Sequence, residues 1–313
     1  MDRLRVQAET RGFFTRQDAL KLGYDDKSIR RALKVQAWVR IRNGTYTFPE
    51  LWAAQDGLSR HLVTGHAVAH KMHPHVALSH TSAAVAHKFA LWRPELEPVH
   101  VTRLDGGAGR TEAGVQHHEG FCIEDDVMEL DGFLVVRPAR AALEAASLTD
   151  SERGLIILDS ALRSGVPQAE LDEAFSLVTS WPSSRGLQIT LRMANAKAES
   201  PGESRSRYFF YAHGLPAPEL QWHVHDDSGR LCGITDFAWP EHRLLGEFDG
   251  RVKYGRLLRP GEQPGDAVFR EKLREDLLRR VTGWRMVRLV WSDLAQPAAT
   301  TSMMWDMLGL SAA

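Results

Sequence analysis

The chain has 313 residues, too many for one ordinary compact core, and this length predicts two or three domains. A hydrophobic content of 43% and a charged content of 25% exclude disorder as the main state. The formal net charge is −1, so any argument for nucleic-acid binding has to be local. The two cysteines, Cys122 and Cys232, form neither a disulfide framework nor a zinc-ribbon spacing and fit a reducing compartment. Without an apolar signal core or a long uncharged apolar stretch, we expect a cytoplasmic protein that does not span a membrane.

The first 55 residues are predicted to form a small helical unit closed by a hairpin. A helix covers roughly residues 4–11, and Thr15 is a good N-cap for a second helix. Asp25 or Asp26 caps a third helix. The segment WVRIRNGTYTF then alternates around Asn43-Gly44, a strong pattern for a β-hairpin. This order of elements is that of a winged helix-turn-helix.

The charge of this first segment differs from that of the whole chain. Residues 1–50 hold eleven basic and six acidic side chains, a balance of +5, which leaves −6 for the rest of a chain of net charge −1. A helix-turn-helix places its second helix in the major groove of DNA. We therefore expect DNA contacts from the third helix and the wing, through Lys27, Ser28, Arg30, Arg31, Lys34, Arg40 and Arg42. The alternative is an ordinary charged surface that serves protein contacts.

Residues 56–197 are predicted to be mainly helical with a few short strands. The patterns indicate strands around residues 99–103, 115–119 and 132–136, with helices before and after them. Seven of the 14 histidines lie between His61 and His87. His66 and His70 have the i, i+4 spacing of a zinc site, but Ala67 stands where the HExxH motif needs glutamate. We interpret these histidines as surface or capping groups.

Residues 198–313 change in character and predict a third domain. A helix ends near Gly214, and two alternating segments flank the turn Asp226-Asp227-Ser228-Gly229. The segment RLLGEFDG is a third strand, a charged helix ends at Gly283, and WRMVRLVW is a fourth strand. The predicted order is α, β, β, β, α, β.

Carboxylates gather at one place in this predicted sheet. Asp236 ends the second strand, and Glu247 and Asp249 stand two residues apart on the third, so the latter two share a face. Glu203 on the preceding helix is a further candidate. Oxygen ligands of this kind suit Mg²⁺ or Mn²⁺, which can activate water and stabilise charge on a phosphate. The alternative is that the aspartates begin turns and Glu247 is a solvated edge residue.

The segments ESPGESRSR, ITDFAWPEHRLLGEFDGRVKY and FREKLREDLLRRVTGWRMVRLVW resemble the Vsr-like domain of the PD-(D/E)xK nuclease superfamily. The resemblance covers about the last 115 residues. It implies a restriction-endonuclease-like mixed sheet flanked by helices, with Glu203 as the helix acid and with Asp236 and Glu247 as metal ligands. Asp249 would be a third ligand or the mark of a lost lysine, because the family's core motif has lysine at this position.

Other cations could take over the role of that lysine. Lys253 lies four residues beyond Asp249, and Lys272 and Arg274 lie on the following charged helix as candidate phosphate contacts. Glu271, Arg274 and Glu275 have helical i, i+3 and i, i+4 spacings, so a solvated face of ion pairs is equally compatible with this helix.

The N-terminal segment resembles the winged-helix domain of AbiEi-type antitoxins, which act as transcriptional autorepressors. The segments ALSHTSAAVAHKFALW and ELDGFLVVRPARAALEAAS look like the region that follows this winged helix in related proteins.

Two hypotheses follow for an α/β (α+β) protein with domains at 1–55, 56–197 and 198–313. The first is a metal-dependent DNA endonuclease or nicking enzyme, targeted by the winged helix and acting in repair or phage defence. The second is a non-catalytic DNA-binding regulator of the antitoxin type with a nuclease-like fold. DNA is the expected partner, and a second copy of the chain and a toxin or defence-system protein are further candidates.

Overall fold

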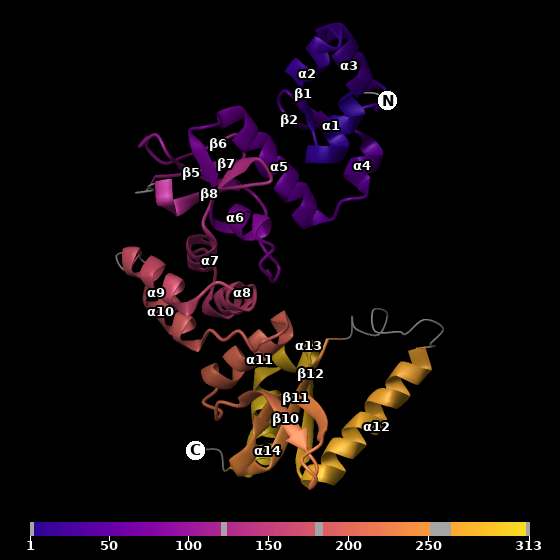
Figure 1. Cartoon of the computed structure of the whole chain (residues 1–313), viewed down its shortest axis with the longest axis vertical. Coiled ribbons are helices and arrows are strands. Elements are labelled where there is room, and N and C mark those ends of the chain that lie inside the picture. Colours follow the sequence, from indigo (N-terminus) through magenta and orange to yellow (C-terminus); the bar gives the residue numbers. More distant parts are fainter. Residues whose placement is uncertain (1–2, 120–123, 179–183, 251–263, 311–313) are drawn as a thin grey trace. The chain divides into compact units, whose positions relative to one another are not determined.

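The computed structural model describes residues 3–119, 124–178, 184–250 and 264–310 (Figure 1), the side chains of 124 and 264–268 excepted. Contacts group the chain into two compact units. The first holds residues 1–148 and 166–184, and the second holds residues 149–165 and 185–313. The predicted α+β fold class is confirmed, because helices and mixed sheets alternate along the chain. Among the described residues, no helix is long and apolar enough to cross a membrane.

The first unit begins with the predicted winged helix-turn-helix. It comprises α1 (Arg3–Arg11), β1 (Phe14–Thr15), α2 (Arg16–Lys21), α3 (Asp26–Lys34), β2 (Val39–Arg42) and β3 (Thr45–Thr47). The strands form one sheet in the order β1-β3-β2. Both short helices begin with a reciprocal capping box, Thr15 with Asp18 in α2 and Asp25 with Ser28 in α3. Of the two expected caps for the third helix, Asp25 is the one observed.

Aromatic and aliphatic side chains hold these elements together. Phe14 is fully buried, and its ring packs edge-on against Trp38 with centroids 4.8 Å apart. Ile29 places the inner face of α3 in the same core. The opposite face of α3 is therefore directed to solvent.

The rest of the first unit is built on a six-stranded mixed sheet in the order β6-β7-β5-β4-β9-β8. Its strands are β4 (Val76–Leu78), β5 (Val99–Arg103), β6 (Arg110–Glu112), β7 (Val115–His118), β8 (Val127–Leu130) and β9 (Phe133–Val136). The three strands expected from the sequence are present. Helices also occur through residues 56–197, but the strands are more numerous than expected and join into a single sheet.

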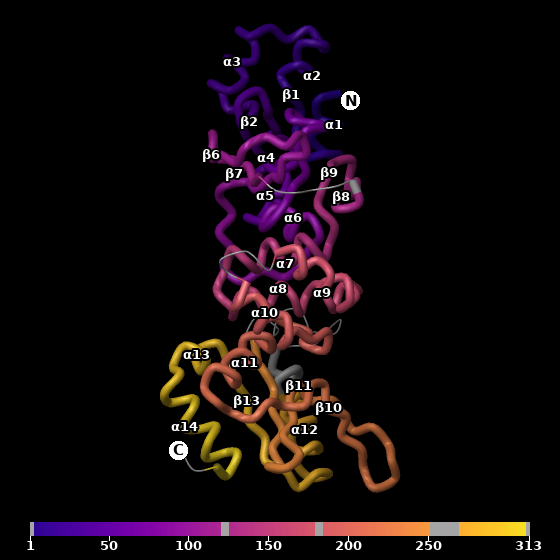
Figure 2. The backbone as a smooth tube through the Cα atoms, turned by 90° about the vertical axis from the view of Figure 1, so that its left-hand side faces the viewer, coloured from indigo at the N-terminus to yellow at the C-terminus, as the bar shows by residue number. Residues whose placement is uncertain are grey.

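Helices precede, connect and follow these strands along the chain (Figure 2). The helices of the first unit after the wing are α4 (Pro49–Ala53), α5 (Gly57–Met72), α6 (His80–Ala86), α7 (Pro138–Ser147) and α9 (Gln168–Leu177). Helices α5 and α6 pack on β5, and α7 packs on α6 and α9. The short α6 begins directly after β4, which brings its first residues beside β5.

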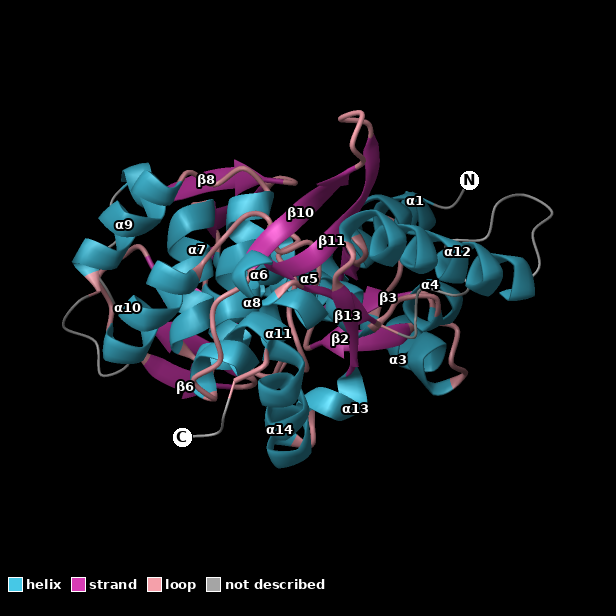
Figure 3. Ribbon diagram, turned by 90° about the horizontal axis from the view of Figure 1, so that it is seen from below, coloured by secondary structure: helices cyan, strands magenta, loops and turns pink. Residues whose placement is uncertain are grey.

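The second unit contains a four-stranded sheet in the order β10-β11-β12-β13. Its elements are α8 (Ser151–Arg163), α10 (Ser184–Met193), α11 (Pro201–Ala212), β10 (Glu219–His225), β11 (Leu231–Trp239), β12 (Leu244–Asp249), α12 (Pro264–Thr282), β13 (Arg285–Val290), α13 (Trp291–Leu294) and α14 (Pro297–Leu308). Strands β12 and β13 are parallel and the other pairs are antiparallel. From α11 to β13 the order is the α, β, β, β, α, β that the sequence predicts. The β10–β11 hairpin projects from the unit in both Figures 2 and 3.

Each face of this sheet has its own core, because successive side chains of a strand point to opposite faces. On one face, Phe210 of α11 and Met304 of α14 pack against Phe237 and Phe248. On the other face, Leu278 of α12 packs against a smaller cluster that includes Leu245. The side of the sheet that faces α12 is the side on which the candidate carboxylates lie.

Candidate nucleic-acid interface and carboxylate cluster

The outer face of α3 carries a stripe of cations. Lys27, Arg31 and Lys34 stand at i, i+4 and i+7, so one side of the helix presents all three. Their side chains are exposed, as are those of Arg30 and, on β2, Arg40. The structure therefore places five of the seven predicted DNA-contacting residues at the surface of the winged helix.

The acidic residues of this domain are paired elsewhere. Arg11 contacts Asp18 at 2.5 Å, and Arg16 contacts Asp26 at 2.7 Å. Arg5 pairs with Glu9 and Glu50. Within the part of the chain that the structure describes, no ion pair is found for the cations of α3. Four exposed cations of the segment that form no such ion pair therefore lie on α3.

The two other predicted contacts have local partners. The Ser28 hydroxyl takes part in the capping box of α3, where its Oγ accepts from the Asp25 backbone N–H at 2.8 Å. Arg42 donates from Nη2 to the Ala113 carbonyl at 2.9 Å, in the turn between β6 and β7. Both side chains have structural roles that are independent of DNA.

The structure brings Asp236, Glu247 and Asp249 together on the α12 side of the second sheet. Phe237 lies opposite Gly246 in the antiparallel register, which places Asp236 beside Glu247. Asp236 accepts through Oδ2 from the Phe248 backbone N–H at 2.8 Å. Glu247 and Asp249 lie on the same face of β12, as the sequence predicts.

Two arginines form ion pairs with this cluster. Arg274 of α12 contacts Oε1 of Glu247 and pairs with Glu271 at 2.9 Å. Arg288 of β13 lies 3.3 Å from Oε2 of Glu247 and 3.7 Å from Asp249. Arg288 also pairs with Glu275 at 3.1 Å. Arg274, which the sequence offers as a phosphate contact, is held as a partner of these carboxylates.

Burial changes the acid strength of the central carboxylate. Only 7% of Glu247 is exposed, and this desolvation raises the pKa of Glu247 to about 7, against the opposing effect of Arg274. The charges of Glu271 and Asp236 raise this pKa further. The pKa of Glu247 therefore lies close to neutral pH.

Glu203 has a capping role. Its Oε2 accepts from the Glu199 backbone N–H at 2.9 Å, and its Oε1 accepts from the Ser200 hydroxyl at 2.7 Å. Gln221 also donates to Oε2. Helix α11 packs its Phe209 and Phe210 on the face of the sheet opposite α12. The sequence indicates this capping role, because Ser200-x-x-Glu203 is a capping-box pattern. The metal-site interpretation overlooks this pattern.

The remaining predicted site residues lie outside the cluster or outside the described residues. Lys253 is among the residues that the structure does not describe. Lys272 is exposed on α12.

The carboxylates have the donor chemistry for Mg²⁺, but both oxygens of Glu247 already contact guanidinium groups. Among the described side chains, the oxygens of Asp236, Glu247 and Asp249 are also not a set that lies within 4.8 Å of one another. In this arrangement the cluster does not fit a magnesium site.

A group of histidines in the first unit is absent from the sequence predictions. Among the described side chains, only His80, His100 and His118 bring three metal-ligating atoms within 4.8 Å of one another. Burial lowers the pKa of His100 and of His118 to about 4, so these rings are neutral at pH 7. The interpretation of the histidines as surface or capping groups is wrong for His66, which is buried and stacks on Phe133 with ring centroids 4.1 Å apart.

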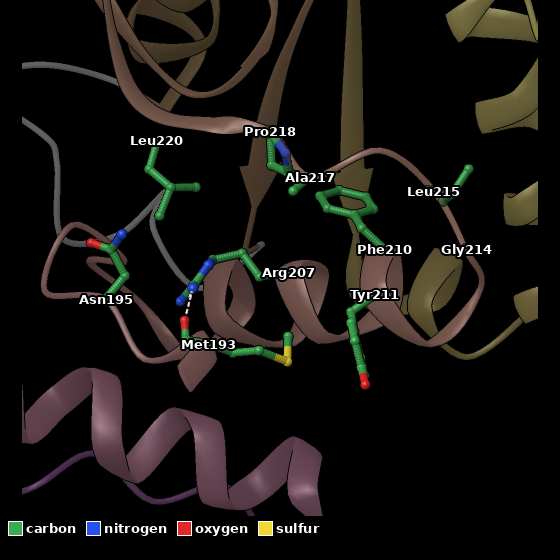
Figure 4. A pocket seen from close by; sticks show the side chains of 10 residues that line it. All are labelled: Met193, Asn195, Arg207, Phe210, Tyr211, Gly214, Leu215, Ala217, Pro218 and Leu220. Carbon is green, nitrogen blue, oxygen red and sulfur yellow. Dashed lines mark hydrogen bonds between the residues drawn. The ribbon is translucent and has the colours of Figure 1, made fainter. Parts of the chain in front are cut away.

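The second unit has a pocket of about 380 Å³ beside α11 (Figure 4). Arg207 lies on its wall and hydrogen-bonds to the Met193 carbonyl. The same guanidinium pairs at 2.7 Å with Asp159 of α8, which is fully buried. None of the predicted site residues lines this pocket.

Comparisons with known proteins give a family model for the N-terminal segment and two relatives that match most of the chain. A family model described as a transcriptional regulator, AbiEi antitoxin, matches residues 4–49, the segment of the winged helix. Two proteins of Mycobacterium tuberculosis, Uncharacterized protein MT2308 of strain CDC 1551 / Oshkosh and Uncharacterized protein Rv2248 of strain H37Rv, are each 31% identical to the chain over 221 residues. The matches cover 69% of this chain and 76% of each relative. The chain belongs to their family.

We refer to this group as the Rv2248 family. A crystal structure of the RV2827C protein from Mycobacterium tuberculosis matches with a TM-score of 0.40 and 16% identity, covering 71% of this chain and 83% of that one. A likeness at this level carries no argument about function. For this member of the Rv2248 family, the AbiEi resemblance of the N-terminal segment is confirmed, and the PD-(D/E)xK resemblance of the C-terminal segment stays a prediction.

Proposed function

We propose that the protein is a DNA-binding transcriptional regulator of the AbiEi-antitoxin type. The observation that carries the proposal is the exposed stripe of Lys27, Arg31 and Lys34 on the outer face of α3. This helix is the second of a helix-turn-helix, the position that enters the major groove. The match of residues 4–49 to the AbiEi antitoxin model supports the same function.

In this domain, the residues that hold α3 in position differ from the residues that carry its charge, an arrangement that suits DNA binding. Ile29 and Trp38 fix α3 in the core, and the capping box of Asp25 fixes its N-terminus. The cations can then contact phosphates without reorganising the helix. Asp26 at the start of α3 would repel phosphate, but its pairing with Arg16 offsets this charge.

Selection of genomic DNA tests the proposal. The purified full chain is incubated with fragments of its own genome at physiological salt, and bound fragments are sequenced. We expect enrichment of a small set of sites, including the region upstream of the protein's own gene, and repression of a reporter driven from that region. Retention no greater than that of shuffled fragments would contradict the proposal.

The matched variants are Lys27→Ala/Arg31→Ala/Lys34→Ala and a control that also removes three charges, Lys71→Ala/Lys197→Ala/Arg280→Ala. The control residues are exposed cations outside the winged helix. Loss of repression in the first variant alone assigns binding to α3. Equal loss in both would show that total charge, and not the α3 face, is responsible.

A metal-dependent nuclease is the second candidate. The α, β, β, β, α, β order and the juxtaposition of Asp236 with Glu247 favour it. It requires Arg274 to leave Glu247 so that a cation can bind there. A cleavage assay on plasmid and single-stranded DNA with Mg²⁺ and Mn²⁺ tests it, comparing the wild type with Asp236→Ala. Equal behaviour of the two proteins removes this candidate.

A further inference from the structure

Three histidines that are distant in sequence meet beside the first unit's six-stranded sheet. Strands β7, β5 and β4 are neighbours; the first two contribute one histidine each, and the third histidine follows β4. His100 lies on β5, His118 ends β7, and His80 follows β4 as the first residue of α6. The Ser79 backbone N–H donates to the His100 carbonyl at 3.1 Å, which fixes the start of α6 against β5.

The register of the strands directs two of these side chains to the same face. His100 lies opposite Gln116, and Thr102 lies opposite His118 in the parallel β5–β7 pair. His100 and Thr102, like Gln116 and His118, are two residues apart and share a face. The result is a contact of 2.8 Å between His100 Nδ1 and His118 Nε2. His80 stacks on His118 with centroids 3.6 Å apart.

We propose that His80, His100 and His118 form a binding site for a zinc ion. Imidazole nitrogens are ligands that Zn²⁺ prefers, and three histidines with a fourth position open to water or another ligand are an established zinc geometry. The three rings are buried or half-buried and their ligand atoms lie within 4.8 Å of one another.

The groups that contact His80 are of the kind that surround a metal-bound histidine. Its Nδ1 lies 3.1 Å from the Ser79 hydroxyl and 3.3 Å from Glu144 Oε2. Glu144 is 1% exposed and is itself held by Arg140 at 2.7 Å. A carboxylate on one ring nitrogen directs the other nitrogen, Nε2, toward a metal and raises its basicity. Orienting the His80 ring in this way would explain why the Glu144 carboxylate is buried.

The backbone of His80 supports the same assignment. Its φ is +49°, in the left-handed region that a residue with a side chain rarely adopts. The Glu144 carboxylate accepts from the His80 backbone N–H at 3.1 Å and stabilises this conformation. Glu144 thus fixes both the backbone and the ring of one ligand.

Zinc binding requires a small rearrangement. Two nitrogens that each lie about 2.0–2.1 Å from a tetrahedral zinc are about 3.3 Å apart. The pair His100 Nδ1 and His118 Nε2 would therefore exchange a hydrogen bond for two metal bonds and separate by roughly half an ångström. The His80 ring would tilt out of its stack with His118 to direct Nε2 at the ion.

Zinc alone, added to the full-length chain after removal of bound metals, tests the site. Competition with a chromophoric chelator gives the affinity, and elemental analysis gives the stoichiometry. We expect one zinc per chain. X-ray absorption at the zinc edge of the wild type should show three imidazoles and one light ligand. Absence of zinc uptake, or coordination without imidazole, overturns the proposal, and neither result depends on the folding of a variant.

Variants locate the site. His118→Gln removes the most exposed of the three ligands, and we expect at least about a hundredfold weaker zinc binding. Glu144→Gln should weaken it by about ten- to a hundredfold, because it removes the carboxylate from His80. His75→Gln, an exposed histidine of the same unit, is the matched control and should bind zinc as the wild type does. Unchanged affinity of His118→Gln at wild-type thermal stability would also overturn the proposal.

Discussion

Salt dependence of DNA binding gives the sharpest quantitative test of the α3 stripe. Each phosphate that a cation neutralises contributes about 0.9 to the slope of log K against log salt. Replacing Lys27, Arg31 and Lys34 by alanine should lower this slope by about 2.7 if all three contact phosphate. Between about 50 and about 200 mM salt, the wild type should then lose roughly 40-fold more affinity than the variant.

The assay needs no knowledge of the operator. Fluorescence anisotropy of a mixed-sequence duplex measures non-specific binding, which is almost entirely electrostatic. The triple variant Lys71→Ala/Lys197→Ala/Arg280→Ala serves as the control and should keep the wild-type slope. Thermal melting should be unchanged in both variants, because all six side chains are exposed. An unchanged slope for the α3 variant refutes the assignment of this helix to the DNA backbone.

Three further predictions concern the second unit. Arg207→Ala should lower the free energy of unfolding by about 3–5 kcal/mol, because it leaves the buried Asp159 carboxylate without its guanidinium partner. Denaturant titration measures this loss, with the exposed Arg192→Ala as the control. Equal stability of the two variants would contradict the importance of the ion pair. Because the pKa of Glu247 is raised in the folded state, the folded protein binds this proton more tightly than the unfolded chain does. The stability that results is fully present below the ordinary glutamate pKa and is lost as the pH rises through about 7. Glu247→Gln should therefore gain about 2 kcal/mol relative to the wild type between pH 5 and pH 8, whereas Glu241→Gln at an exposed site should show no such trend. Gly202→Ala would place a methyl group against the Phe248 ring and should destabilise the unit by about 1–3 kcal/mol, with a lower melting temperature as the measurement; an unchanged melting temperature would show that the ring moves freely.

Sequence patterns predict the elements well where the determinant is local. The caps Thr15 and Asp25 and the hairpin at Asn43-Gly44 depend on neighbouring residues, and all are present in the structure. The two-residue spacing of Glu247 and Asp249 likewise predicts a shared face, which the ion pairs of Arg288 confirm.

Partners that come from distant parts of the chain were not predictable in this way. Arg288 follows Glu247 by 41 residues and reaches it through the parallel pairing of β12 with β13. The histidines at positions 80, 100 and 118 meet only because β7, β5 and β4 are neighbours in the sheet. A sequence shows the abundance of histidine but not this strand order.

The two compact units are interleaved along the chain, since residues 149–165 belong to the second unit and residues 166–184 return to the first. A fragment that starts at residue 198 would lack α8, and with it Glu152 and Asp159, the partners of Arg205 and Arg207. Cleavage of the chain near residue 148 or 166 should likewise leave the pieces associated under native conditions. Domain-by-domain dissection of this protein is therefore best done by point substitution or by co-expression of complementary pieces, because a simple truncation removes part of a folded unit.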